Sequence, residues 1–507
     1  MGLLLFLLVA AVYGFTTSGE VQIIDVLQTV AVAENLVRHG SFAIPHFQVW
    51  SGGGAVIGVG GQHFAPHGIG LSLLYAPIVA LLDVLYGIPH PALALFSTSF
   101  VDPFLGAVGV VAAYGVARDL DIGEAPAAGM ALLFAFSTIQ WAYAHVAFDA
   151  VPSETFLLLG VWCLHRATVV DRAKGLWLVG SGASLGFSLL IRIQMALALP
   201  FLLGYLAVKL WPRGRERGIR EPVMRAVSWG LPIAAALVVV AWFNQVRFGS
   251  IFDNGHAADP NTALNVPILT GLHGLLASPG KSIFLFAPPL VVGLAGLCWL
   301  LRRQRALGAA IAGILVTNLL LNAKLHNWAG DLAWGPRFLV PFMGLAIIPA
   351  AFVLTRWRTL PWTWRAGVVV AGVAGFAVQV LANVFNYVAV DLAWKVSVPP
   401  GPSYYWSLSR SQLALTLRSA LQTIHGKSPY GHVAAGGITG VPPGPLPHVD
   451  FWWVLLRDRY DHVSAVAAVG AVMVVVMLGS TMVLVRRLAG VGVVSLDAGV
   501  VTGPPGG

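Results

Sequence analysis

The chain has 507 residues, of which 57% are hydrophobic and only 10% are charged, and its mean hydropathy is +0.79. These values exclude an ordinary soluble domain and predict an all-α protein that crosses a membrane many times. The net charge of +9 does not indicate a nucleic-acid partner, because most of the cations gather in short clusters between apolar stretches. Cys163 and Cys298 both fall inside apolar stretches, so neither a disulfide framework nor a thiolate metal site is expected.

Apolar stretches of the length that a hydrocarbon core requires, about 20 residues, recur along the whole chain. The first, at 1–15, lacks a basic start and a convincing cleavage site, so we interpret it as an uncleaved span rather than a signal peptide. Further spans are expected at 95–117, 127–144, 151–169, 176–190, 195–208, 227–246, 282–301, 307–321, 338–355, 366–388 and 463–485, which makes about 12 in all.

Basic clusters follow every second span, and this spacing predicts how the chain is threaded. They lie at 166–174, 209–225, 302–305, 356–365 and 486–487. The positive-inside rule assigns all of them, and with them both termini, to the cytoplasm. The opposite, exterior face then receives Asp149 and the segments 18–94, 247–281, 324–337 and 390–462.

One further apolar stretch, Ile69–Tyr86, would reverse this threading if it crossed the membrane. We therefore expect it to lie along the outer interface, flanked by Gly68, Gly70 and Pro89. A second amphipathic segment, at 23–39, precedes it. The first exterior loop, 18–94, is thus predicted to carry two juxtamembrane helices.

Five exterior segments, in this order, resemble recurring segments of a known family. They are SGE at 18–20 followed by Asp25 and by AENLVRHGS at 33–41, GQHFAPHGIG at 61–70, NQVRFGSIF at 244–252, SPGKSIFLF at 278–286 and NWAGDLAWGPRFL at 327–339. Together with the expected threading they resemble the bacterial GT-C glycosyltransferases, of the dolichyl-phosphate-mannose-protein mannosyltransferase and aminoarabinose transferase-like superfamily. The resemblance covers most of the first 355 residues, and nothing after Leu392 takes part in it.

This resemblance implies a multi-pass enzyme of a bacterial plasma membrane that uses a polyprenyl-phosphate-linked sugar donor. Its acceptor would be a glycan, a lipid or a protein. One departure is Pro66-His67, where members of the family often carry Lys-Tyr with the lysine near the donor phosphate; His67 or Lys281 could stand in for it.

Sugar transfer with inversion needs a carboxylate to take a proton from the acceptor hydroxyl and cations to hold the departing phosphate. Asp25 is the expected base, because it stands at the outer interface at the head of the first juxtamembrane helix; the helix dipole alone would also favour an acid there. Glu20 is the rival. Asp149 and Glu154, in and after the next exterior turn, are expected either to join the site or to cap a helix.

The expected phosphate ligands are cations at the exterior ends of spans. Arg suits phosphate because its planar fork donates in pairs, although such residues also reach toward lipid headgroups. The candidates are Arg337, Arg192, Lys281, Arg247 and His67.

The chain lacks the motifs of several other site types. Ser51-Gly52-Gly53-Gly54 has no following Lys-Ser/Thr pair, and no His/Cys spacing indicates a metal, so no cofactor is expected, although a divalent metal is possible. The predicted organisation is a catalytic membrane module at 1–389, an exterior insert at 390–462, and a last span with a cytoplasmic tail at 463–507. A secondary transporter or lipid flippase is the alternative, but no internal repeat supports it.

Overall fold

The structure is a computed structural model that describes residues 1–44, 55–215, 220–256, 259–394, 402–430, 449–460 and 463–497. Parts of the expected insert (395–401, 431–448 and 461–462) and of the expected cytoplasmic tail (498–507) lie outside the described residues, as do the glycines at 52–54 and the basic residue Arg217.

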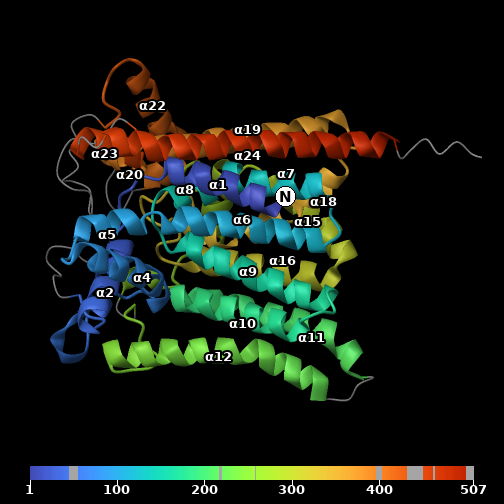
Figure 1. The fold of residues 1–507 in the computed structure, drawn as a ribbon, viewed down its shortest axis with the longest axis horizontal. Coiled ribbons are helices and arrows are strands. Elements are labelled where there is room, and N and C mark those ends of the chain that lie inside the picture. Colours follow the sequence, from blue (N-terminus) through green and yellow to red (C-terminus); the bar gives the residue numbers. More distant parts are fainter. Residues whose placement is uncertain are drawn as a thin grey trace, which may run out of the picture.

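Long helices that run side by side form the body of the molecule (Figure 1). They are apolar on most of their surface, which is the composition of helices surrounded by lipid or by one another. These helices are α1 (Gly2–Thr16), α6 (Val101–Asp119), α9 (Ala150–Val169), α10 (Lys174–Ile191), α12 (Arg220–Phe248), α16 (Arg305–Lys324), α19 (Trp362–Val384) and α24 (Val463–Asp497).

Other expected spans are built from short helices in succession. Proline accounts for several of the breaks: Pro288 and Pro289 lie between α14 and α15, and Pro349 lies between α17 and α18. The runs are α5 (Pro91–Thr98) with α6, α7 (Glu124–Ser137) with α8 (Gln140–His145), η2 (Ile193–Ala198) with α11 (Leu199–Arg215), α14 (Ile283–Phe286) with α15 (Leu290–Arg303), and η4 (Arg337–Phe342) with α17 (Met343–Ile347) and α18 (Ala350–Thr355).

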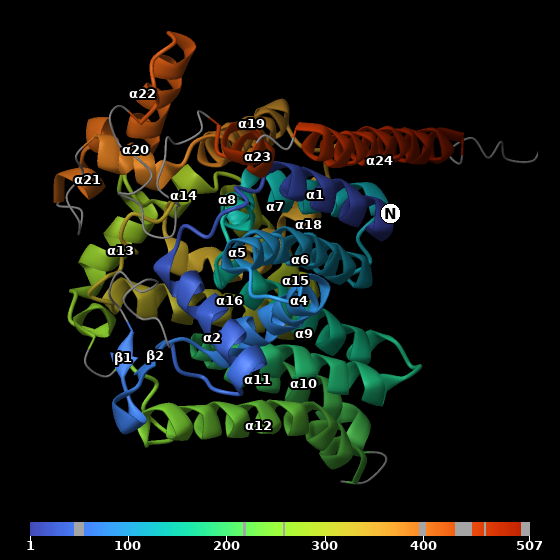
Figure 2. The same ribbon diagram turned by 60° about the vertical axis from the view of Figure 1, so that its left-hand side comes forward.

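The remaining elements gather at one end of this bundle, where α1 and α10 finish and α6 and α9 begin, and which we call the site end (Figures 1 and 2). The amphipathic helix α2 (Ile24–His39) and helix α4 (Ile69–Tyr86) lie there, with a two-residue antiparallel ladder between β1 (Val56–Ile57) and β2 (His63–Phe64). The other elements of this end are η1 (Val59–Gly61), η3 (Pro260–Thr262), α13 (Ile268–Ala277), α20 (Tyr387–Ala393), α21 (Pro402–Trp406), η5 (Leu408–Arg410), α22 (Gln412–Ile424) and α23 (Trp452–Tyr460).

Small and aromatic residues share the interior of the bundle. Ala112 and Ala113 on α6 and Ala127 and Ala128 on α7 are fully buried, and Phe134 on α7 fills the space beside them. Short side chains allow helix backbones to approach closely, which is how membrane helices pack in the absence of a hydrophobic driving force between them.

The expected all-α architecture is confirmed, including a helix at each of the two predicted juxtamembrane positions. Each of the stretches expected to cross the membrane falls on a helix or on one of the helix runs above. Eight helices of the described residues are long and apolar enough to cross by length and composition, and Ile69–Tyr86 is one of them. The count of about 12 spans, the interfacial position of Ile69–Tyr86 and the domain boundaries therefore stay predictions.

The packing of α4 favours the interfacial position. Its first turn crosses the end of α10: a Cβ at Gly68 would lie 2.2 Å from the backbone oxygen of Leu190, and one at Gly70 would lie 2.7 Å from Ile191. The second half of α4 is exposed on Leu81, Val84 and Leu85. A helix that meets the end of a span and then leaves the bundle fits the surface of a bilayer.

If α4 stays on one side, both of its flanks face the same compartment. Single cysteines placed at the exposed Gln62 and Ile88, in a protein that lacks Cys163 and Cys298, should both react with an impermeant thiol reagent added outside the cell. Labelling of only one position would show that α4 crosses, and would reverse the threading of every later span.

Candidate functional site

Asp25 lies in the first turn of α2, where the positive end of the helix dipole favours a carboxylate. Its side chain is 37% exposed, so a ligand can reach it. The Nε2 atom of His67 lies 3.7 Å from Oδ1 of Asp25, and the ring of His256 lies 6.2 Å from that of His67. Two residues of the segment 18–94 and one of the loop after α12 thus meet at the site end.

His67 is held in place by two contacts of its loop. Gly68 and Gly70 allow the backbone to lie directly on Leu190 and Ile191, so a larger residue at either glycine would collide with α10. From α12, the buried guanidinium of Arg247 donates to the backbone oxygens of Ala65 and His67, the latter at 3.1 Å. The close approach to Ile191 also brings this loop beside Arg192, the next residue of the chain.

Arg192 and Arg337 lie around one aromatic ring. The guanidinium carbon of Arg192 is 5.8 Å from the centre of the Phe148 ring, and that of Arg337 is 5.9 Å from it. Arg192 forms a two-bond ion pair with Asp149, at 2.9 Å for each bond, and Arg337 donates to Asp331 at 3.3 Å. Three segments, at 148–149, 192 and 331–337, therefore share one basic centre, which we call the arginine pair.

Each member of the arginine pair keeps a buried donor with no partner in the described residues. These donors are Nη1 of Arg192 and Nε of Arg337. A buried charged N–H without a partner costs free energy, so native proteins seldom leave one without a ligand or water. Two such donors, on guanidinium groups that contact the same ring, are candidates for binding an anion.

Asp102 fixes the ring that both arginines contact. This fully buried residue of α6 accepts a hydrogen bond from the backbone N–H of Phe148 at 2.8 Å. The contact anchors the turn that carries Phe148 and Asp149 to a rigid helix. Asp102 is thus a positioning residue of the site.

The charges of the site act directly on Asp25. Burial disfavours its carboxylate, but four nearby basic groups outweigh burial and lower the pKa of Asp25 below its ordinary value. In order of their effect, these groups are His67, Arg337, Arg192 and His256. Asp25 is therefore ionised, and able to accept a proton, throughout the neutral range.

Lys281 organises the loop that carries Arg337. It is fully buried, and its Nζ donates to the backbone oxygens of Asp331 at 2.9 Å, Ala333 at 2.6 Å and Gly335 at 3.2 Å. An ammonium group has three hydrogens, so all of its donors are used. The structure thus separates Lys281 from the arginine pair, and burial lowers its pKa.

Helix α22 binds the same loop through Gln412. Gln412 donates to the backbone oxygen of Leu332 at 3.0 Å, and its Oε1 accepts from the N–H of Gly335 at 3.2 Å. Gly335 has a φ of +59°, a conformation that a residue with a side chain rarely adopts. Arg337 therefore follows a turn whose shape is fixed at nearly every backbone group.

The other expected site residues take different positions. Glu154 is fully buried within α9, and its Oε1 accepts from the N–H of Gly344 at 2.5 Å, which caps the start of α17. Glu20 is almost fully buried after α1, where its backbone exchanges hydrogen bonds with Ser18. Arg247, as described above, directs two of its nitrogens to carbonyls of the His67 loop and a third, Nη2, to Asn244 at 3.0 Å. The structure brings Asp25, His67, Asp149, Arg192 and Arg337 together, and leaves these three outside the centre.

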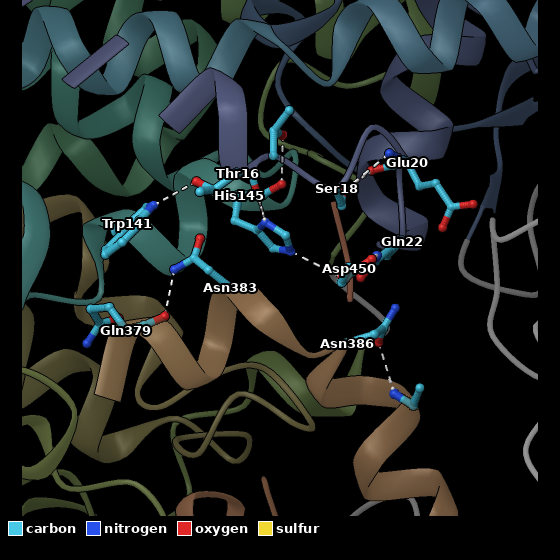
Figure 3. A network of polar contacts seen from close by, with 12 residues as sticks. Thr16, Ser18, Glu20, Gln22, Trp141, His145, Gln379, Asn383, Asn386 and Asp450 are labelled. Atoms are coloured by element: carbon cyan, nitrogen blue, oxygen red, sulfur yellow. Dashed lines mark hydrogen bonds and ion pairs between the residues drawn. The ribbon is translucent and has the colours of Figure 1, made fainter. Parts of the chain in front are cut away.

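A second polar centre, next to Glu20, joins the segment after α1 to the segment before α23 (Figure 3). His145 lies between the backbone oxygen of Thr16, at 2.5 Å from Nδ1, and Oδ2 of Asp450, at 3.1 Å from Nε2. Gln22 donates to the same carboxylate at 3.0 Å. Trp452 closes the contact: its backbone N–H donates to the backbone oxygen of Thr17 at 2.9 Å, and its indole N–H donates to that of Gly14 at 3.0 Å. This network joins α1, α8 and the segment before α23.

In the parts of the chain that the structure describes, no group of three or more His, Cys, Asp and Glu side chains is placed to hold a metal ion.

Comparison with known structures decides the fold. Over 96% of this chain and 77% of the other, it superposes on ArnT from Cupriavidus metallidurans, crystallised with bound undecaprenyl phosphate, at a TM-score of 0.52 and 14% sequence identity. The same protein in its apo state gives a TM-score of 0.51 over 96% and 76%. ArnT is a GT-C glycosyltransferase. The chain has the GT-C fold.

The chain also superposes on an oligosaccharyltransferase from Archaeoglobus fulgidus in its apo form. That superposition covers 77% of this chain and 57% of the oligosaccharyltransferase, at 12% identity and a TM-score of 0.49. No family model matches the sequence, and no curated protein matches it. The GT-C fold expected from the exterior segments is confirmed, and the chain is a multi-pass membrane protein.

Several residues that shape the candidate site carried no signal in the sequence. Asp331 and Phe148 have no diagnostic spacing, and His256 is an isolated histidine of a polar loop. Gln412 follows Leu332 by 80 residues, so only the folded chain shows that the two meet.

Substitution of Lys281 separates the two roles considered for it. If it holds the 331–335 carbonyls, Lys281→Met should lower the free energy of unfolding by about 1–3 kcal/mol, measured by thermal unfolding in detergent, because buried acceptors lose their partner. The exposed Lys427→Met should unfold like the unsubstituted protein. Full stability of Lys281→Met, combined with lost affinity for undecaprenyl phosphate, would instead make Lys281 a phosphate ligand.

Proposed function

We propose that this protein is a membrane glycosyltransferase that moves a sugar from a polyprenyl-phosphate carrier to an acceptor on the extracytoplasmic face. The observation that carries the proposal is the arginine pair, with an unpartnered buried donor on each guanidinium group and an ionised carboxylate close by. The GT-C fold, and the undecaprenyl phosphate bound to ArnT, support a lipid phosphate as the ligand.

Arg192 and Arg337 hold the phosphate of the donor in this proposal. Their two unused N–H groups donate to phosphate oxygens, and their charges stabilise the negative charge that grows on the phosphate as its bond to the sugar breaks. Asp149 keeps Arg192 oriented through the two-bond ion pair, and Asp331 does the same for Arg337 through one bond. Positioned charges of this kind need no reorganisation during the reaction.

Asp25 is the general base of the reaction. Its carboxylate takes the proton of the acceptor hydroxyl while the hydroxyl oxygen forms a bond to the anomeric carbon of the sugar. The bond from this carbon to the phosphate oxygen breaks, and polyprenyl phosphate leaves with the electron pair. Attack from the side opposite the phosphate inverts the configuration of the sugar.

His67 lies 3.7 Å from Asp25 and makes the largest contribution to lowering the pKa of this carboxyl. A base with a low pKa is a weak one. Contact with the acceptor hydroxyl therefore has to be close, and the open face of Asp25, which is 37% exposed, permits such a contact.

The identity of the base is tested by two matched amide substitutions. Asp25→Asn keeps the size and the helix-start preference of the side chain but cannot take a proton, so sugar transfer should fall by about 10² to 10⁴. Glu20→Gln should retain most of the activity. Transfer is measured as the cell-envelope glycan restored to a deletion strain of the native host by each variant.

Both variants should reach the membrane in normal amounts and should bind undecaprenyl phosphate, because neither side chain touches the phosphate in this proposal. The opposite pattern, with Asp25→Asn active and Glu20→Gln inactive, would make Glu20 the base. Normal transfer by both variants would rule out the proposed mechanism.

A further inference from the structure

Helix α22 turns its polar side toward the protein and its apolar side away from it. Gln412, Thr416 and Ser419 are fully buried, whereas Leu417 and Leu421 are each 50% exposed and Ile424 is 79% exposed. The three exposed residues follow one another at the spacing of one helix face. A helix at the surface of a water-soluble protein buries its apolar side and exposes its polar side. The exposed apolar side of α22 therefore indicates a contact with another protein surface or with lipid.

The position of α22 narrows the choice of partner. It projects away from the bundle at the site end, across the direction of the long helices, in both views (Figures 1 and 2). At its base, Leu415 packs against Phe385 and Ala389, just past the end of α19. Helix α19 is a candidate span, and Val369 and Val373 on it are exposed as lipid-facing residues would be. A helix that leaves the end of a span at a steep angle lies along the surface of the bilayer.

Basic residues of α22 and its C-cap, together with a tryptophan that contacts the helix, agree with such a place. Arg418 and His425 lie along one border of the apolar stripe and are exposed. The guanidinium of Arg418 lies 5.8 Å from the ring centre of Trp394, whose indole N–H donates to Ser419 at 3.1 Å. Cationic residues attract anionic headgroups, and tryptophan concentrates at the membrane–water interface.

We propose that α22 lies in the outer interface of the membrane, with Leu417, Leu421 and Ile424 in the acyl region and Arg418 and His425 among anionic headgroups. A bilayer covers the apolar stripe without a second protein, and the inference does not depend on the proposed enzyme activity. Because Gln412 begins this helix and binds the 332–335 backbone, α22 also anchors the Arg337 loop to the membrane surface.

Depth measurements on the full chain test this proposal. Nitroxide labels on Leu417→Cys and Leu421→Cys, made in a protein without Cys163 and Cys298, are examined in vesicles of phosphatidylcholine and phosphatidylglycerol. Val373→Cys on α19 supplies the lipid-facing reference, and Gln62→Cys supplies the aqueous one. Because all four side chains are exposed, the substitutions leave the core intact.

The labels at 417 and 421 should collide with oxygen more than with a water-soluble nickel chelate, in a ratio near that of position 373 and far from that of position 62. A ratio like that of position 62 would overturn the proposal. Shielding from both reagents would also overturn it, by showing that residues 431–448 or another protein cover the stripe. Disulfide-linked dimers of Leu421→Cys would overturn it in favour of a second copy of the chain.

Discussion

Two guanidinium groups, 5.8 and 5.9 Å from the centre of one phenylalanine ring, set the electrostatic demands that the rest of this structure meets. Arg192 and Arg337 would repel each other in a dry environment, so each needs its own counter-charge and a fixed backbone. Asp149 and Asp331 supply the charges. The donors left over after these pairings give the site its capacity for an anion.

The fold supplies the fixed backbone from distant parts of the chain. Asp102 in α6 holds the turn of Phe148, Lys281 and Gln412 hold the loop of Arg337, and the glycines at 68 and 70 press the His67 loop onto α10. Charged groups that would be costly inside a membrane protein are thus used either as ligands of backbone carbonyls or as partners of one another. Near Asp25, Arg192 and Arg337 each keep one buried donor that has no partner in the described residues.

Charge and hydropathy in the sequence were sufficient to predict the class of the protein, and they pointed to one end of the bundle as the place of the candidate site. The family resemblance made Asp25 a candidate, and the positions of Arg192 and Arg337 at the ends of apolar stretches did the same for these two residues. The same criterion selected Lys281, Arg247 and Glu154, which the fold uses to bind carbonyl and N–H groups. The position of a charged residue in the sequence does not show how many of its hydrogen bonds are made with backbone groups. The two groups of residues differ in that number of backbone hydrogen bonds.

Contacts that join remote segments were beyond the reach of the sequence. Gln412 and the 332–335 loop, or His145 and Asp450, meet only because helices of fixed length bring them to the same end. The role of the last hundred residues is the main example. The segment 390–462 matched nothing in the resemblance. Within it, Gln412 of α22 binds the Arg337 loop, and Trp452, the first residue of α23, binds Thr17 just after α1.

The binding of undecaprenyl phosphate to purified protein tests the central claim most directly. Arg337→Ala and Arg192→Ala should each weaken binding by about 1.5–3 kcal/mol, roughly tenfold or more in Kd, because each removes a charge-assisted donor. Arg337→Lys should recover only part of the loss, since an ammonium group lacks the planar fork. The exposed Arg418→Ala serves as the control and should bind normally. Unchanged affinity in both alanine variants of the arginine pair would contradict the account.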